Sequence, residues 1–109
     1  MRHAHLRASR LYSANHEALK FYSGAIYPRH LRSFPKFGVQ AHGFWTAKND
    51  EVPRLFVLVS YAEGDDPVEI EKRYLRSPEL AEDVEGFDVG NIVRVETTML
   101  LPSTASPLM

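Results

Sequence analysis

The residues of this chain that could do chemistry are a few histidine, arginine, serine and carboxylate side chains on its predicted strands. They are His5, Arg7, His42, Ser60, Arg94 and Glu96. If they share one face of a sheet, a carboxylate beside a histidine is the minimum for general acid–base catalysis. Alternatively, Arg94 and Glu96 pair with other charges at a subunit interface or an exposed sheet edge, and then they have no chemical role.

Metal binding by histidine is a second possible chemistry. His3 and His5 are two residues apart on a strand and, with His42, could hold zinc or iron. Because no carboxylate partner can be assigned to them, we expect no metal and no other cofactor. His30 is expected on a solvated turn after Pro28, without a catalytic role.

Other catalytic and binding classes lack their motifs. The chain has no cysteine, which excludes disulfides, thiolate catalysis and cysteine-ligated zinc. It also contains no phosphate-binding loop, no dinucleotide-binding glycine motif and no nucleophile elbow.

The elements that would position these residues follow from apolar spacing and capping signals. The alternation over 3–11 predicts a half-buried strand. Ser13 or Asn15 offers an N-cap for a first helix. Pro28 is expected to interrupt that helix, with one or two further turns over 29–34.

The middle of the chain predicts a β-hairpin. Alternating residues over 39–47 and the apolar run 55–61 are separated by the polar turn 48–53. The second of these strands is apolar on both faces, with Leu55, Val57, Val59 and Tyr61 on one side and Phe56 and Leu58 on the other.

Two cap-and-proline signals follow the hairpin. Asp66-Pro67 predicts the start of a second helix with Ile70 and Tyr74 on its inner face. Ser77-Pro78 predicts a short helix to about residue 84, and the last strand is expected over 92–101.

The order strand, helix, strand, strand, helix, strand predicts a ferredoxin-like α+β fold. In this split βαβ arrangement both helices cover one face of a four-stranded antiparallel sheet. A chain of 109 residues fits one domain. We therefore expect a single domain over 1–101 and a C-terminal tail over 102–109.

Strict alternation assigns each strand residue to one of the two sheet faces. The face under the helices is expected to be almost wholly apolar, with Leu6, Ala8, Val39, Ala41, Gly43, Trp45, Leu55, Val57, Val59, Tyr61, Val93, Val95 and Met99. The opposite face is expected to be mixed, with His3, His5, Arg7, Ser9, Gln40, His42, Phe44, Thr46, Phe56, Leu58, Ser60, Ile92, Arg94, Glu96 and Thr98.

The apolar centre of that mixed face predicts self-association. Its members are Phe44, Phe56, Leu58 and Ile92, a larger patch than a monomer normally exposes. We expect a homodimer through this face, with two sheets packed as a barrel-like sandwich.

Four segments carry a family resemblance: Leu6-Arg7-Ala8, 38–46, Ser60-Tyr61 and 74–79. They resemble the NIPSNAP-like family of dimeric α+β barrel proteins. Arg7 matches the arginine of that family's first-strand pattern and Trp45 the aromatic residue after its second-strand glycine, whereas Ser9 stands where an aromatic is usual. The resemblance implies ferredoxin-like subunits that dimerise through their sheets, in a group of which many members have no established activity.

Two functional classes are consistent with these features. The preferred one is a homodimeric binding module that holds a small apolar molecule between its sheets. The alternative is an enzyme similar to the cofactor-independent monooxygenases of the dimeric barrel kind, acting on an aromatic substrate placed by His42, Phe44 and Arg94. The candidate ligand-binding residues are His42, Phe44, Phe56, Leu58, Arg7, Arg94 and Glu96.

Composition argues against two kinds of partner. A net charge of −1 gives no concentrated basic surface for nucleic acid. No apolar run approaches the roughly 20 residues that cross a bilayer. We therefore expect no nucleic acid, no membrane insertion and a cytoplasmic location, although the basic segment 1–16 also has the composition of a targeting peptide.

Overall fold

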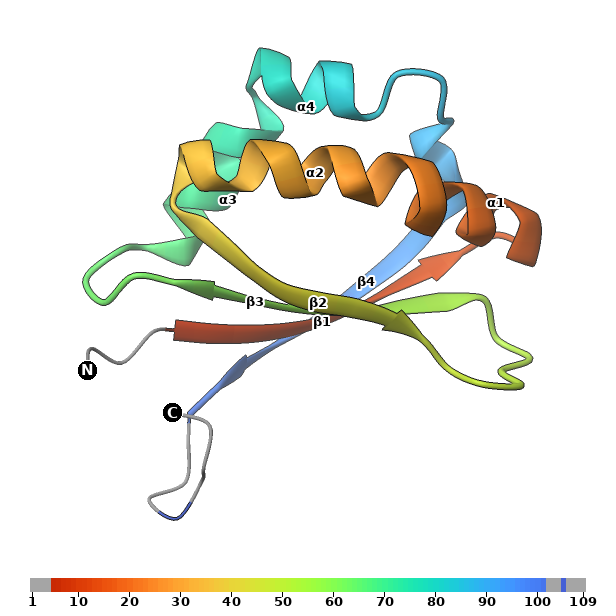
Figure 1. Ribbon diagram of the computed structural model, residues 1–109, viewed down its shortest axis with the longest axis horizontal. Coiled ribbons are helices and arrows are strands. Elements are labelled where there is room, and N and C mark those ends of the chain that lie inside the picture. Colours follow the sequence, from red (N-terminus) through yellow and green to blue (C-terminus); the bar gives the residue numbers. More distant parts are fainter. Residues whose placement is uncertain (1–4, 102–104, 106–109) are drawn as a thin grey trace.

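Four strands and two helical segments follow one another in the predicted order (Figure 1). A computed structural model describes residues 5–101 and 105, so His3 and all of the predicted tail except Ala105 lie outside the described residues. The main elements are β1 (His5–Ser13), α1 (His16–Phe21), α2 (Tyr27–Ser33), β2 (Val39–Thr46), β3 (Arg54–Tyr61), α3 (Pro67–Leu75), α4 (Pro78–Asp83) and β4 (Ile92–Leu100).

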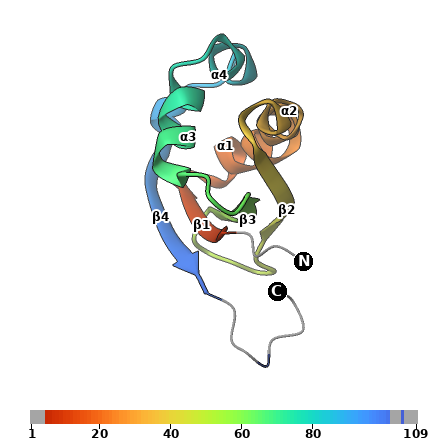
Figure 2. The same cartoon turned by 90° about the vertical axis from the view of Figure 1, so that its left-hand side faces the viewer.

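The strands form one antiparallel sheet in the order β2-β3-β1-β4. Strands β1 and β3 are central, and β2 and β4 are the edges. The helices all lie on one side of the sheet (Figure 2). We call the other side the open face, because none of the described helices covers it. This is the four-stranded α+β arrangement that the order of elements predicts.

Capping residues start the helices where the sequence predicts. Asn15, Asp66 and Ser77 each accept a hydrogen bond from a backbone amide of the first turn, at 2.8, 3.0 and 3.2 Å. Pro67 and Pro78 occupy the first helical positions of α3 and α4, where a missing N–H group costs nothing.

The first helical segment does not end at Pro28, and the prediction of a break there was wrong. A π-helical turn, Tyr22–Ile26, joins α1 to α2, and the amide of Tyr27 bonds the carbonyl of Tyr22. The wider turn lets the helix pass a proline, which lacks an amide hydrogen and whose ring would clash with the carbonyl four residues earlier. The helical path therefore continues to Ser33 and carries His30 over the sheet.

A β-bulge reverses the predicted faces in the second half of β2. The pairing with β3 skips His42, between Ala41 and Gly43. Beyond the bulge, Phe44 packs against the core under the helices, and Trp45 is 54% exposed on the open face. The opposite placement was predicted and was wrong, because strict alternation contains no extra residue. The residues that change faces with them are Gly43 and Thr46.

Strand β1 is also turned over relative to the prediction. Arg7 and Ser9 lie directly opposite two buried valines of β3 that form the core. Because directly opposite residues of an antiparallel pair share a face, Arg7 and Ser9 lie under the helices, and Leu6 and Ala8 lie on the open face. The prediction failed because β1 is a central strand whose two sides do not differ clearly in polarity.

An irregularity in the pairing at the start of β4 places Ile92 on the opposite sheet face from the one predicted. Tyr12 pairs with Arg94 and Ser13 pairs with Ile92, so Val93 is an extra residue. Ile92 therefore packs against the core and does not lie on the open face as predicted. The rest of β4 keeps its predicted faces, with Val95 and Met99 on the helix side and Arg94, Glu96 and Thr98 on the open face.

The core lies between the helices and one side of β3, the side that was predicted to face them. Leu55, Val57, Val59 and Tyr61 are all buried, and Ile26 of the π-helical turn is fully enclosed. Burial of this one side of β3 was predicted correctly from its alternation.

Candidate ligand-binding cavity

A cavity of about 200 Å³ lies between the helices and the sheet. Much of its wall is apolar, including Phe34, Val57 and Ile70. Leu75 of α3 and Val95 of β4 also line it and are 58% and 52% exposed. The cavity therefore opens between α3 and the edge strand β4.

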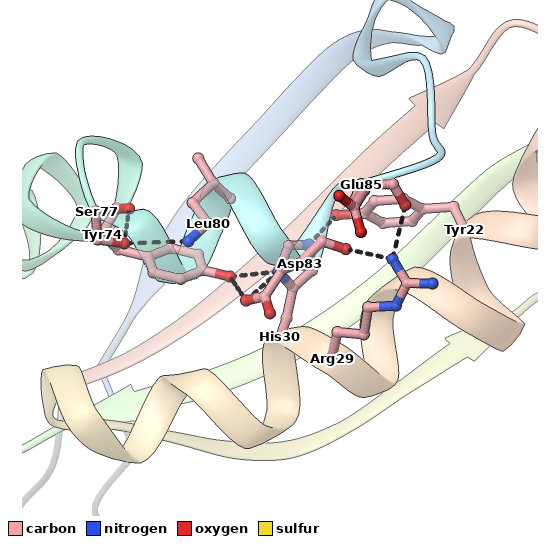
Figure 3. A network of polar contacts seen from close by, with 8 residues as sticks. All are labelled: Tyr22, Arg29, His30, Tyr74, Ser77, Leu80, Asp83 and Glu85. Carbon is pink, nitrogen blue, oxygen red and sulfur yellow. Dashed lines mark hydrogen bonds and ion pairs between the residues drawn. The ribbon is translucent and has the colours of Figure 1, made fainter.

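A hydrogen-bonded relay of four side chains adjoins this cavity (Figure 3). His30 Nε2 lies 3.1 Å from the Tyr22 hydroxyl, and His30 Nδ1 bonds the Tyr74 hydroxyl. The Tyr74 hydroxyl in turn donates to Asp83 Oδ2 at 2.7 Å. Tyr22, His30 and Tyr74 line the cavity. The relay thus connects both helical segments of the chain beside the cavity.

The relay determines which nitrogen of His30 carries the proton. Burial lowers the pKa of His30, and the opposing effect of the Asp83 carboxylate is smaller, so the ring is neutral at neutral pH. Tyr74 donates its only proton to Asp83 and must therefore accept one from His30 Nδ1. His30 Nε2 is then an acceptor for the Tyr22 hydroxyl. The 3.6 Å approach of His30 to Asp83 is consequently not an ion pair.

The tyrosines of the cavity are neutral phenols. Burial raises the pKa of Tyr22, Tyr27 and Tyr74 well above the ordinary value. The Tyr27 hydroxyl has no hydrogen-bond partner among residues 5–101. It is therefore available as a donor or an acceptor inside the cavity.

Arg7 brings a positive charge to the cavity wall. Its Nε atom is buried and has no partner in the described part of the chain. Its Nη1 lies 3.4 Å from Glu71 Oε2 of α3, and its guanidinium lies 5.3 Å from the centre of the Tyr61 ring. The Glu71 side chain is 52% exposed and the contact is long, so this ion pair neutralises Arg7 only partly.

Arg29 fixes α4 above α2. Its Nη1 donates to the carbonyl oxygens of Asp83 and Glu85, at 3.2 and 2.7 Å (Figure 3). Carbonyl groups at a helix C-terminus carry partial negative charge and attract a cation. This contact holds the backbone of Asp83 in the position that the relay requires.

The structure does not bring the seven predicted ligand-binding residues together. Arg7 and Phe44 lie under the helices, and Phe44 packs on Tyr27 with ring centres 4.7 Å apart. Five others lie on the open face: His42, Phe56, Leu58, Arg94 and Glu96. Only Arg7 among the seven lines the cavity.

The polar residues of the open face are paired with one another. His42 Nε2 lies 2.8 Å from Ser60 Oγ. Glu96 accepts from the Tyr12 hydroxyl at 3.0 Å and contacts Arg10 and Arg94 at 3.1 and 3.5 Å. His42 therefore has serine, not a carboxylate, as its partner, and the predicted histidine–carboxylate pair is not formed by His42 and Glu96.

Sequence reasoning missed the relay. His30 was expected on a solvated turn, whereas it is 4% exposed. Tyr22, Ile26 and His30 follow one another at steps of four residues, which indicates one helical face, but the expected break at Pro28 hid this pattern. Tyr74 was correctly placed on the inner side of its helix, whereas nothing in the sequence pointed to Asp83 as its partner.

Neither a metal site nor a membrane-spanning helix occurs among residues 5–101 and 105. Within that range no three histidine, aspartate or glutamate side chains gather closely enough to hold a metal ion. None of the helices there is long and apolar enough to cross a membrane.

Solved structures of NIPSNAP proteins share this fold. One, from Agrobacterium tumefaciens, is 19% identical over 96% of this chain and 99% of that chain, with a TM-score of 0.69. Another from that organism, of unknown function, is 15% identical over 100% of both chains, with a TM-score of 0.74. An uncharacterised NIPSNAP-like domain protein from Burkholderia xenovorans is 22% identical over 94% of this chain and 89% of that chain, with a TM-score of 0.62.

No protein-family model and no curated protein matches the sequence. The likeness to known proteins therefore lies in the arrangement of the chain in space. The chain has the α+β fold of the NIPSNAP-family proteins of known structure, as its sequence resemblance predicts.

Proposed function

We propose that this protein is a binding module for a small, largely apolar molecule about the size of one aromatic ring, held between the helices and the sheet. The observation that carries the proposal is the cavity of about 200 Å³ with its mouth between α3 and β4. A dry engineered cavity of about 150 Å³ in another protein binds benzene, whereas drug-sized ligands need about 300 to 1,000 Å³. One ring is therefore the scale of ligand that fits.

The polar groups of the cavity support binding more than acid–base chemistry. Tyr22, Tyr27 and Tyr74 remain protonated at neutral pH because burial raises their pKa. Both nitrogens of His30 are engaged with tyrosines of the relay. Groups held in this way orient a ligand and exclude water, but they do not present a free base to it.

This position differs from the one that the sequence predicts, which is between two sheets. The cavity lies on the helix side of the sheet, and most of the predicted residues lie on the open face. Ligand binding and self-association therefore use opposite sides of the sheet in our proposal, and each can be tested without disturbing the other.

Blocking the mouth of the cavity tests the ligand proposal. Benzyl alcohol, benzamide and benzoate should raise the melting temperature of the wild-type protein, since a ligand at 100 times its Kd stabilises by about 2.7 kcal/mol. Val95→Trp should reduce this rise because Val95 lines the mouth. Val93→Trp is the matched control, since Val93 is 61% exposed on the same strand and does not line the cavity. If none of the three compounds shifts the melting temperature, the proposal is wrong.

We also propose that the open face joins two copies of the chain. Its centre holds the apolar side chains of Leu6, Phe56 and Leu58, with Trp45 beside them. Several of its polar side chains are already hydrogen-bonded to one another, so burying them in an interface leaves few polar groups without a hydrogen-bond partner. A second copy would cover the apolar centre without requiring new polar partners.

A further inference from the structure

We infer that the ligand of this cavity carries a carboxylate group and that Arg7 and Tyr27 bind it. The inference rests on the proposed function, since it names the chemical class of the molecule in the same cavity. The ligand would then be a small carboxylic acid with an apolar body, of which benzoate is the simplest aromatic example.

The unpaired Nε atom of Arg7 is the first observation. A buried donor without a partner is unfavourable by about 1 to 3 kcal/mol, and more for a charged group, so buried donors in folded proteins are nearly always hydrogen-bonded. Arg7 Nε is buried and has no partner in the described part of the chain, although the residue lines a cavity. An acceptor atom of a ligand would supply the missing bond.

The charge of the cavity distinguishes an anionic acceptor from a neutral one. Arginine carries a permanent positive charge in proteins, and the Glu71 carboxylate that faces Arg7 at 3.4 Å is half exposed to solvent. Around Arg7 the aromatic rings of Tyr27 and Tyr61 bring no negative charge, because burial raises the pKa of both phenols. A positive charge that is only partly neutralised in mostly apolar surroundings favours an anion.

The number of donors selects carboxylate among small anions. Arg7 Nε and the Tyr27 hydroxyl are unpaired donors of two residues that line the same cavity, and the Arg7 charge acts on the Tyr27 hydroxyl. Two donors match the two oxygens of a carboxylate, whereas a phosphate offers more acceptor oxygens and more charge than these groups would satisfy. The apolar wall formed by Phe34, Val57 and Ile70 then receives the rest of the molecule.

A comparison of benzoate with benzamide tests the inference, because the two have the same shape and differ in charge. Isothermal titration of the full chain at neutral pH should give a benzoate Kd at least about tenfold lower than that of benzamide. Arg7→Met should raise the benzoate Kd by about tenfold or more and leave benzamide within about threefold. Arg73→Met is the control, since Arg73 is exposed on the same helix as Glu71 and does not line the cavity.

A variant at Glu71 should change benzoate affinity in the opposite sense from Arg7→Met. Glu71→Gln should tighten benzoate binding, because it removes a competing carboxylate and the charge of Arg7 is then no longer offset by Glu71, while benzamide binding should stay unchanged. This result does not depend on whether Arg7→Met folds. A Glu71→Gln variant that binds benzoate more weakly would overturn the inference.

The outcomes separate the inference from the proposal on which it rests. If benzamide binds as tightly as benzoate and Arg7→Met changes neither, the cavity binds small molecules but the assignment of a carboxylate is wrong. If neither compound binds, the inference is wrong, and if benzyl alcohol does not bind either, the proposed function is wrong as well.

Discussion

The Tyr74 hydroxyl and the Asp83 carboxylate lie 2.7 Å apart, and their hydrogen bond ties α3 to α4 next to the buried ring of His30. These two helices have nine and six residues, too few for either to be stable alone. Side-chain bonds of this kind therefore help to hold the helical layer in place over the cavity.

Tyr74→Phe should destabilise the fold by about 1 to 3 kcal/mol. The change removes the donor to Asp83, which is 7% exposed, and the acceptor for His30 Nδ1. Urea unfolding followed by circular dichroism measures the loss. Tyr12→Phe is the matched control, because its hydroxyl donates to Glu96, whose side chain is 37% exposed and also contacts arginines. An equal loss in the two variants would show that the relay adds no particular stability.

The stability of the protein should decrease as the pH falls below about 6.5, the ordinary pKa of histidine. Because burial lowers the pKa of His30 in the folded state, the unfolded chain takes up this proton first, and proton uptake favours unfolding. The stabilising contribution of neutral His30 to the free energy of unfolding is fully present above the ordinary pKa. It decreases as the pH falls from the ordinary pKa to the lower folded pKa, and it does not change further below the folded pKa.

The measurement is the free energy of unfolding as a function of pH for the wild type and two variants. His30→Gln should lose this part of the pH dependence. His16→Gln should keep it, because His16 is exposed on α1 and bonds only a backbone carbonyl in the described structure. An unchanged pH profile in His30→Gln would mean that the ring is protonated equally in both states.

Local chemistry was enough to predict most elements of the fold. Asp66-Pro67 and Ser77-Pro78 start helices because a side-chain acceptor and a proline satisfy the first turn without help from the rest of the chain. The hairpin of β2 and β3 followed equally from alternation and a polar turn. These signals act over a few residues, so a single sequence contains them.

The cavity could not be predicted because it depends on departures from regular periodicity. The π-helical turn before Pro28 carries His30 over the sheet. The bulge at His42 turns Phe44 under the helices, where it packs on Tyr27. The orientation of β1 places Arg7 beneath α3, where Glu71 is its partner. Each departure is decided by tertiary packing, which overrides the pattern of apolar residues.

Gly43→Ala should change the fluorescence of the protein with little effect on its stability. A methyl group at Gly43 would lie 2.7 Å from the indole ring of Trp45, so the ring must move aside. Trp45 is 54% exposed and can swing away at small energetic cost. Since it is the only tryptophan of the chain, its emission reports the displacement directly.

The control for this prediction is Gly64→Ala. Gly64 has a φ of +92°, so alanine there is strained although no atom lies near the added methyl group. We therefore expect Gly64→Ala to lower stability without altering the emission. Unchanged tryptophan emission in Gly43→Ala would indicate that the indole does not lie over Gly43.

The protein should sediment as a dimer at micromolar concentration, and Leu58→Lys should dissociate it. Leu58 lies at the centre of the open face, opposite Ala8 of β1, and a lysine there would place an unpaired charge in the interface. Val68→Lys is the matched control, because Val68 is 60% exposed on α3, on the other side of the sheet. Dissociation should also shift the Trp45 emission towards that of a solvated indole. If the wild type sediments as a monomer, the open face is not a dimer interface. If Leu58→Lys remains a dimer, the interface lies elsewhere. The surface to test next is then the exposed edge strand β4, with Val93 and Val95.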